Sequence, residues 1–129
     1  MVPDDDLNMQ HIRSYYAASA NPARLHEPLR GDVTADVCVV GGGIAGCSTA
    51  LHLAERGYSV VLLEARRVAW GASGRNGGQF IFGFASSQDK LVNQAGFDVA
   101  KRMFDISVEA LDLLEERIAR HGIACDLEH

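Results

Sequence analysis

Two short apolar runs lie on either side of a helical pattern near the middle of the chain. Residues 36–40 and 59–63 are almost continuously apolar, which is typical of strands buried on both faces of a parallel sheet. Between them, residues 44–56 carry apolar side chains at helical spacing, and Gly57 marks the end of that helix. Residues 35–64 therefore predict one strand-helix-strand (βαβ) unit with a right-handed crossover.

The longest helical pattern covers residues 97–121. Its apolar residues recur three and four positions apart, and Asp98 and Gly122 suit its start and its end. The resulting apolar stripe consists of Val99, Met103, Ile106, Ala110, Leu113, Leu114 and Ile118. Residues 89–94 predict a further helical turn, and residues 123–127 predict the beginning of another strand.

Two segments lack this periodicity. Residues 1–32 contain the three prolines of the chain and predict an irregular arm, with a short helix within residues 14–19. Residues 70–85 are rich in Gly, Ser and Asn and predict a loop. We therefore expect an α/β fold in which residues 33–129 form the N-terminal part of a Rossmann-like domain with a parallel sheet, ending in a long amphipathic helix.

The number of strands suggests that the predicted domain is truncated. Two strands are too few for a stable open α/β sheet, because their apolar faces need further strands and helices. A buried parallel strand left at an edge would also promote aggregation. We expect either that the chain is a fragment or that a partner supplies the missing layers. Its last residues, 127–129, resemble both native sequence and a cloning scar.

Composition and charge disfavour several classes of binding partner. A net charge of −5 argues against binding to nucleic acid or to a membrane surface, both of which need basic patches. No run of 18 or more apolar residues occurs, and the acidic, polar start of the chain favours a cytoplasmic location. The three cysteines and five histidines show no metal-ligand spacing, so we assign no metal.

A glycine motif stands between the first predicted strand and its helix. The run Gly41-Gly42-Gly43-Ile44-Ala45-Gly46 fits G-x-G-x-x-G and opens a helix directly after a strand, as dinucleotide binding requires. The first glycine allows a tight turn, the second lets the backbone approach a pyrophosphate, and the third lets the helix pack close to the strand. A side chain at Gly43 should therefore clash with the ligand. The helix N-terminus offers unpaired N–H groups to the phosphates.

A carboxylate follows the second predicted strand. Glu64 lies about 20 residues beyond the glycines, where an acidic side chain accepts hydrogen bonds from both hydroxyls of an adenosine ribose. Its charge also repels a 2′-phosphate, which disfavours NADP. Ala65 and Arg66 follow it directly and belong to the same predicted contact. Glycines and carboxylate together predict a dinucleotide site.

The loop after Glu64 distinguishes FAD from NAD. A simple NAD domain usually continues into another helix and strand, whereas this chain enters a Gly-rich loop whose backbone N–H groups suit a pyrophosphate and a ribityl chain. Arg75 would add charge there, and Ser73 and Asn76 would add hydrogen bonds. A flexible surface loop is the alternative. The predicted contacts of this loop are Ala72, Ser73, Arg75, Asn76, Gly77, Gly78 and Gln79.

Residues 39–46, together with Ala50, Leu53, Gly57 and Glu64, resemble the N-terminus of the D-amino acid oxidase-like (DAO) family of FAD-dependent oxidoreductases. The stretches 71–79, 14–21 and 123–127 extend the resemblance over nearly the whole chain. It implies that FAD is bound through Gly41, Gly43, Gly46 and Glu64, with residues 73–79 running along the cofactor toward its ring. It also implies a longer enzyme, whose missing C-terminal part supplies a substrate domain and closes the flavin site.

The resemblance implies a reaction as well, namely oxidation of a C–N bond in an amine or amino acid by hydride transfer to FAD. The substrate would be a small amine, including polyamines and their derivatives, and the chain alone should be inactive. We assign no catalytic residue, and we expect Gln79 and residues 80–82 nearest the flavin ring. Two alternatives stay open: an NAD-dependent dehydrogenase domain and a non-catalytic dinucleotide-binding remnant.

Overall fold

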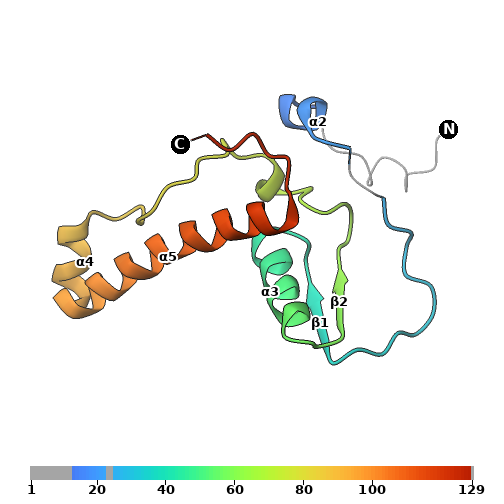
Figure 1. The fold of residues 1–129 in the computed structure, drawn as a ribbon, viewed down its shortest axis with the longest axis horizontal. Coiled ribbons are helices and arrows are strands. Elements are labelled where there is room, and N and C mark those ends of the chain that lie inside the picture. The colour runs from blue at the N-terminus through green and yellow to red at the C-terminus, as the bar shows by residue number, and fades with distance from the viewer. Residues whose placement is uncertain (1–12, 23–24, 129) are drawn as a thin grey trace. The chain divides into compact units, whose positions relative to one another are not determined.

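The computed structural model describes residues 13–22 and 25–128 of the 129-residue chain. The chain divides into two compact units, the first ending at Gly77 and the second beginning at Gly78 (Figure 1). The first unit contains α2 (Tyr15–Ser19), β1 (Val37–Val40), α3 (Ile44–Glu55), β2 (Val60–Leu63) and a 3-10 helix (Ala72–Gly74). The second unit contains α4 (Gln88–Ala95) and α5 (Phe97–His121).

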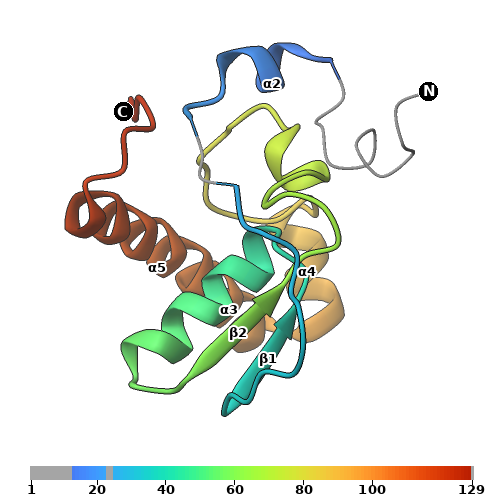
Figure 2. The ribbon, with the colours of Figure 1, turned by 90° about the vertical axis from the view of Figure 1, so that its right-hand side faces the viewer.

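The first unit is built around a parallel pair of strands. Val37 of β1 stands beside Val60 of β2, and the register continues without a break to Val40 and Leu63. The helix α3 connects the two strands and lies along one face of them (Figure 2). This confirms the predicted βαβ unit and its parallel sheet. The predicted division into an arm (1–32) and a domain (33–129) stays a prediction, and residues 1–12 and 23–24 of the arm lie outside the described residues.

The predicted short helix of the arm is present as α2. Ser14 is its N-cap, and the Ser14 hydroxyl accepts a hydrogen bond from the Ala17 N–H at 3.2 Å. A serine is a favoured N-cap because its side-chain oxygen satisfies one of the N–H groups that the first helical turn leaves unpaired.

The two faces of the sheet differ in exposure. Along β1, Val37 and Val39 are half-buried while Cys38 and Val40 are exposed, and Val40 is 83% exposed. The prediction that the strands are buried on both faces is therefore wrong for this chain. Successive side chains of a strand point to opposite faces, and within the described residues α3 is the helix that packs on these strands.

Close packing between α3 and β1 depends on Gly46. A Cβ atom at this position would lie 1.8 Å from the Gly41 carbonyl oxygen and 3.6 Å from Cγ1 of Val39. No side chain fits at the shorter distance. The third glycine of the motif therefore has the packing role that its spacing predicts.

The second unit is an α4–α5 helix pair. Gly96 separates the two helices with a positive φ of 82°, and α5 ends at Gly122 in the left-handed conformation (φ 58°, ψ 42°). The bounds of α5 agree with the predicted 97–121, although the N-cap is Gly96 and Asp98 lies within the first turn. A left-handed C-terminal glycine is a common helix ending because it carries no Cβ penalty.

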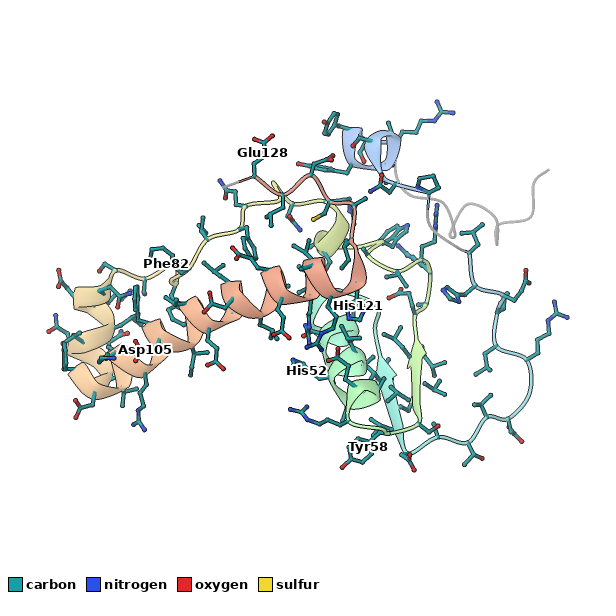
Figure 3. All side chains as sticks on the ribbon, viewed as in Figure 1. His52, Tyr58, Phe82, Asp105, His121 and Glu128 are labelled. Carbon is teal, nitrogen blue, oxygen red and sulfur yellow. The ribbon has the colours of Figure 1, made fainter. Side chains whose placement is uncertain are left out.

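Residues 79–84 run beside α5. The Gly83 N–H donates to the Ser107 hydroxyl at 3.0 Å, and the ring of Phe82 packs edge-on against Phe104 with centroids 5.5 Å apart (Figure 3). Three large members of the predicted apolar stripe remain exposed: Ile106 at 62%, Leu114 at 41% and Val99 at 39%. The stripe is thus partly buried by this segment and partly open.

The strand predicted over residues 123–127 is absent from the structure, in which residues 123–128 form no regular element. Asp126 has a φ of 49°, a conformation that does not occur in an extended strand. Apolar residues alone do not form a strand, because a strand also needs a hydrogen-bonded neighbour. In the part of the chain that the structure describes, β1 and β2 pair with each other and form one two-stranded sheet.

Neither unit encloses a sizeable core. Among the described residues, Ala100 is the one hydrophobic side chain that is fully buried, and many large apolar side chains on the sheet and on α5 are exposed. Over the same residues, no helix combines the length and the apolar character needed to cross a membrane.

We predict that Gly46→Ala destabilises the protein by about 3 kcal/mol, because the new methyl group forces α3 away from the end of β1. Chemical denaturation of the whole protein measures this change. The matched control is Thr49→Ala on the exposed side of the same helix, which should change the free energy of unfolding by less than about 0.5 kcal/mol. Equal stability of the two variants would contradict the close-packing role of Gly46.

Candidate dinucleotide site

A cavity of about 420 Å³ lies at the carboxyl ends of β1 and β2. We call it the sheet-end cavity. Ligands of open α/β sheets bind at this edge, outside the ends of the parallel strands. Six of the residues predicted from sequence line it: Gly42, Gly43, Glu64, Ala65, Arg66 and Ser73.

The glycine turn joins β1 to α3 at one side of this cavity. Gly41 has a φ of 103°, and its N–H donates to the Leu63 carbonyl at 2.7 Å, which extends the strand pairing by one residue. A side chain would be strained at this φ, so the tight turn requires glycine. Gly41 therefore has the conformation that its predicted role, allowing a tight turn, requires.

The N-terminus of α3 faces the Gly-rich loop. The Ile44 N–H donates to the Ser73 hydroxyl at 3.0 Å, and a Cβ atom at Gly43 would lie 2.9 Å from the same oxygen. Ser73, 29 residues away in sequence, therefore caps α3, while the N-cap residue Gly43 contributes no side chain. An anion approaching this helix end meets backbone N–H groups and a hydroxyl that can donate its proton.

The carboxylate of Glu64 is held by two backbone amides. Its Oε2 accepts the Gly42 N–H at 2.6 Å, and its Oε1 accepts the Arg66 N–H at 3.0 Å. Each carboxylate oxygen has two lone pairs, so each can accept one more hydrogen bond. The side chain thus lines the cavity with two acceptors in a fixed orientation, as a pair of neighbouring sugar hydroxyls requires.

Residues 65–75, which include the 3-10 helix and which we call the 65–75 loop, wind tightly against the glycine turn. The Ala69 N–H donates to the Gly42 carbonyl at 2.9 Å, and Ala69 itself has a positive φ of 59°. A Cβ atom at Gly74 would lie 2.2 Å from the Ala69 carbonyl oxygen. These contacts hold the loop in place as a wall of the cavity.

Three lining residues were missed by the sequence reasoning: Ala69, Trp70 and Gly71. The guanidinium carbons of Arg66 and Arg75 lie 3.7 and 4.8 Å from the centroid of the Trp70 ring. The available signal was the single tryptophan of the chain, which stands directly before the Gly-rich stretch. No sequence motif assigns such a residue to a nucleotide.

The remaining predicted residues of the first unit support the loop without lining the cavity. The Asn76 amide donates to the Ala72 and Ser73 carbonyls at 3.2 and 2.9 Å, and the Arg75 Nε donates to the Gly71 carbonyl at 3.3 Å. Ala45 lies exposed on the first turn of α3, and Gly77 ends the unit.

Gly78 and Gln79 belong to the second unit. Gln79 lines a different cavity of about 380 Å³, together with Phe80, Ile81 and residues of α5 such as Ile106. Three of the four residues predicted nearest the flavin ring, Gln79, Phe80 and Ile81, therefore line this cavity, and the fourth, Phe82, packs against Phe104.

The sheet-end cavity fits the adenosine diphosphate part of a dinucleotide. It combines a helix N-terminus for phosphate, a fixed carboxylate for ribose hydroxyls and glycines at the two positions where a side chain would intrude. Across residues 13–22 and 25–128, no group of three or more His, Cys, Asp or Glu side chains is placed to hold a metal ion.

Comparison with known proteins adds a family. Residues 36–129 match the model of the DAO family, described as FAD dependent oxidoreductase. Over 117 residues, the chain is 47% identical to gamma-glutamylputrescine oxidoreductase of Escherichia coli, a match that covers 91% of this chain and 28% of the relative. It is 46% identical to the probable oxidoreductase OrdL of Haemophilus influenzae, covering 91% of this chain and 27% of the relative.

A further relative, the probable oxidoreductase OrdL of Rhizobium meliloti, is 38% identical over 75% of this chain and 23% of its own length. The chain thus spans between 23% and 28% of the length of these three relatives. No solved structure matches it significantly.

We predict that Ser73→Ala lowers the free energy of unfolding by about 1 kcal/mol, because the Ile44 N–H loses its hydrogen-bond acceptor. Denaturation of the whole protein without added nucleotide measures the loss. Thr34→Ala, at an exposed position before β1, is the matched hydroxyl deletion and should have almost no effect. If Ser73→Ala is as stable as that control, Ser73 does not cap α3.

Proposed function

The chain belongs to the DAO family of FAD-dependent oxidoreductases, and on that basis we propose that its sheet-end cavity binds the adenosine diphosphate half of FAD. The observation that carries the proposal is the Glu64 carboxylate, fixed by the Gly42 and Arg66 amides and lining the cavity beside the N-terminus of α3. A carboxylate and a helix N-terminus so close together match a ribose and a phosphate joined in one ligand.

Each part of the site has a distinct role in this proposal. The amides of Gly43 and Ala45 and the Ser73 hydroxyl would face the pyrophosphate at the first turn of α3. The amides of Gly42 and Ile44 would shape the site by holding Glu64 and Ser73. Glu64 accepts the ribose hydroxyls, and Ala65 and Arg66 lie beside the nucleoside. Gly41 and Gly46 supply the turn and the close packing that bring these groups together.

The rest of the Gly-rich stretch would follow the cofactor beyond the pyrophosphate. We assign to this path Ala72, Arg75, Asn76, Gly77, Gly78 and Gln79. The hydrogen bonds of Asn76 to the loop carbonyls support a role in shaping the backbone. Arg75 supports its shape through the bond to Gly71.

Among the alternatives, an NAD-dependent dehydrogenase domain is disfavoured by membership of a family described as FAD dependent. The charge of Glu64 also disfavours NADP, whose 2′-phosphate would meet a carboxylate. A non-catalytic dinucleotide-binding remnant stays open, because the chain covers 28% of its E. coli relative.

For the whole protein we propose oxidation of a C–N bond in a small amine. When bound, FAD would supply the two-electron acceptor for a hydride from the carbon next to the amine nitrogen. Water would then hydrolyse the oxidised substrate to a carbonyl compound and release the nitrogen as an amine or ammonia. The first candidate substrate is gamma-glutamylputrescine, since the E. coli relative bears that name. Residues 41–79 would bind and orient the cofactor, and the missing C-terminal part of the enzyme would supply the substrate site.

We predict that Glu64→Gln weakens FAD binding at least about tenfold, because an amide nitrogen replaces one of the two acceptors that the site uses. Calorimetric titration of the apoprotein with FAD measures the dissociation constant. Glu109→Gln, an exposed change of the same kind on α5, is the control and should leave it unchanged. Equal affinities would remove Glu64 from the site.

The amine proposal is tested by anaerobic reduction of the FAD-loaded whole protein. We expect gamma-glutamylputrescine to bleach the flavin absorbance, and NADH to do so far more slowly. Chemical reduction with dithionite is the control for a responsive flavin. A flavin that dithionite bleaches and a panel of amines does not would refute amine oxidation while leaving FAD binding intact.

A further inference from the structure

Trp70 is the only tryptophan of the chain and lines the sheet-end cavity. The guanidinium carbon of Arg66, which also lines the cavity, lies 3.7 Å from its ring centroid. That distance places the cation in direct contact with the ring face, where the aromatic quadrupole attracts it. Arg66 and Trp70 therefore form one stacked pair in the wall of the cavity.

Both members of the pair are fixed by backbone bonds. The Arg66 N–H donates to Glu64 Oε1 at 3.0 Å, so the backbone of Arg66 is held against the Glu64 carboxylate. The Trp70 N–H donates to the Arg67 carbonyl at 2.9 Å, and the preceding Ala69 is bonded to Gly42. The fold of the 65–75 loop thus fixes the backbone from which the ring projects.

Arg75 braces the tryptophan from a position that does not line the cavity. Its guanidinium carbon is 4.8 Å from the ring centroid, and its Nε donates to the Gly71 carbonyl at 3.3 Å. Two cations on one ring repel each other, and this bond to Gly71 helps to hold the second one there. The loop therefore supplies a second cation within 4.8 Å of the ring centroid, from a residue that does not line the cavity.

The layout of the cavity indicates what this wall contacts. Gly43 and Ser73 lie at the N-terminus of α3, where the proposed function puts the phosphates. Glu64, the first residue after β2, accepts hydrogen bonds from the glycine turn on one side and from Arg66 on the other. With phosphate and ribose assigned, the wall formed by Ala65, Arg66, Ala69 and Trp70 is left for the base. A planar guanidinium stacks well on the face of a base.

We propose that Trp70 is a positioning residue that holds the Arg66 guanidinium as the surface on which the adenine of the dinucleotide stacks. This inference rests on the proposed FAD site. A free arginine side chain loses rotamer freedom when it orders against a ligand, and the stack with Trp70 removes that cost before binding. Trp70 thereby acts on the base through Arg66.

The test compares ADP with UDP, which share ribose and diphosphate and differ in the size of the base. Calorimetric titration of the FAD-free whole protein gives both dissociation constants. We expect Trp70→Ala to weaken ADP roughly fivefold to tenfold and UDP much less, so that the preference for ADP shrinks. Trp70→Phe keeps an aromatic face for Arg66 and should retain most of the preference.

The matched control is Tyr58→Ala, which removes a half-exposed ring just before β2, at the other end of the strand from Glu64 (Figure 3). Both dissociation constants should stay at their wild-type values. A variant that loses structure would weaken ADP and UDP alike, so the ratio of the two separates positioning from unfolding.

Arg66→Gln tests whether Trp70 acts on the base through Arg66, because it removes the guanidinium and leaves the tryptophan in place. It should reduce the preference for ADP as Trp70→Ala does, and the double variant should lose no more than either single one. Independent, additive losses, or an unchanged ratio of ADP to UDP in Trp70→Ala, would overturn the inference while the FAD site stands. Failure of the wild-type protein to bind ADP would overturn both.

Discussion

The hydrogen bond between the Gly42 N–H and the Glu64 carboxylate, 2.6 Å long, is the contact on which the site depends. It joins the turn after β1 to the residue after β2, 22 positions apart, at the edge where the two strands end. A charged acceptor makes such a bond shorter and stronger than a neutral one. Because the bond fixes the carboxylate beside the N-terminus of α3, it sets the distance between an acidic group and the backbone amides of that helix end. Parallel pairing of only four residues in each strand is enough to create this geometry.

Around that bond, the 65–75 loop turns a generic βαβ unit into a shaped cavity. Ser73 caps α3 from 29 residues away, Ala69 bonds to the glycine turn, and Gly74 allows the loop to fold back closely on Ala69. The loop therefore closes the site through contacts with both the strand end and the helix start. Its stacked Arg66–Trp70 pair adds a flat, cationic surface next to the ribose position. The same phosphate and ribose elements occur in many dinucleotide sites, so selectivity for one base or cofactor must come from such a loop.

The helices and the βαβ unit could be predicted because their signals are local. Apolar periodicity sets the face of α5, and Gly122 ends it through a left-handed conformation that glycine adopts without strain. The prediction of a strand at 123–127 is wrong because a strand depends on a non-local partner: it exists only when another strand pairs with it. In addition, Asp126 has a positive φ, which an extended strand does not allow. The prediction that both sheet faces are buried is wrong for a similar reason, because Val40 would need another helix or strand packed over it. The wall made by Trp70 could not be foreseen, since it arises from contacts between side chains that no spacing rule relates.

The sequence by itself determined the strand-helix-strand order, the glycine turn after the first strand and the acidic residue after the second, because each rests on spacing within a short segment. Only the tertiary structure decided that Ser73 is the cap of α3, that Glu64 is held by two amides, and that Arg66 and Arg75 lie against the ring of Trp70. The Ser73–Ile44 contact joins residues 29 positions apart, a separation that carries no signal of their proximity. These contacts form because parallel pairing of β1 and β2 brings the glycine turn, Glu64 and the 65–75 loop to the same edge of the sheet.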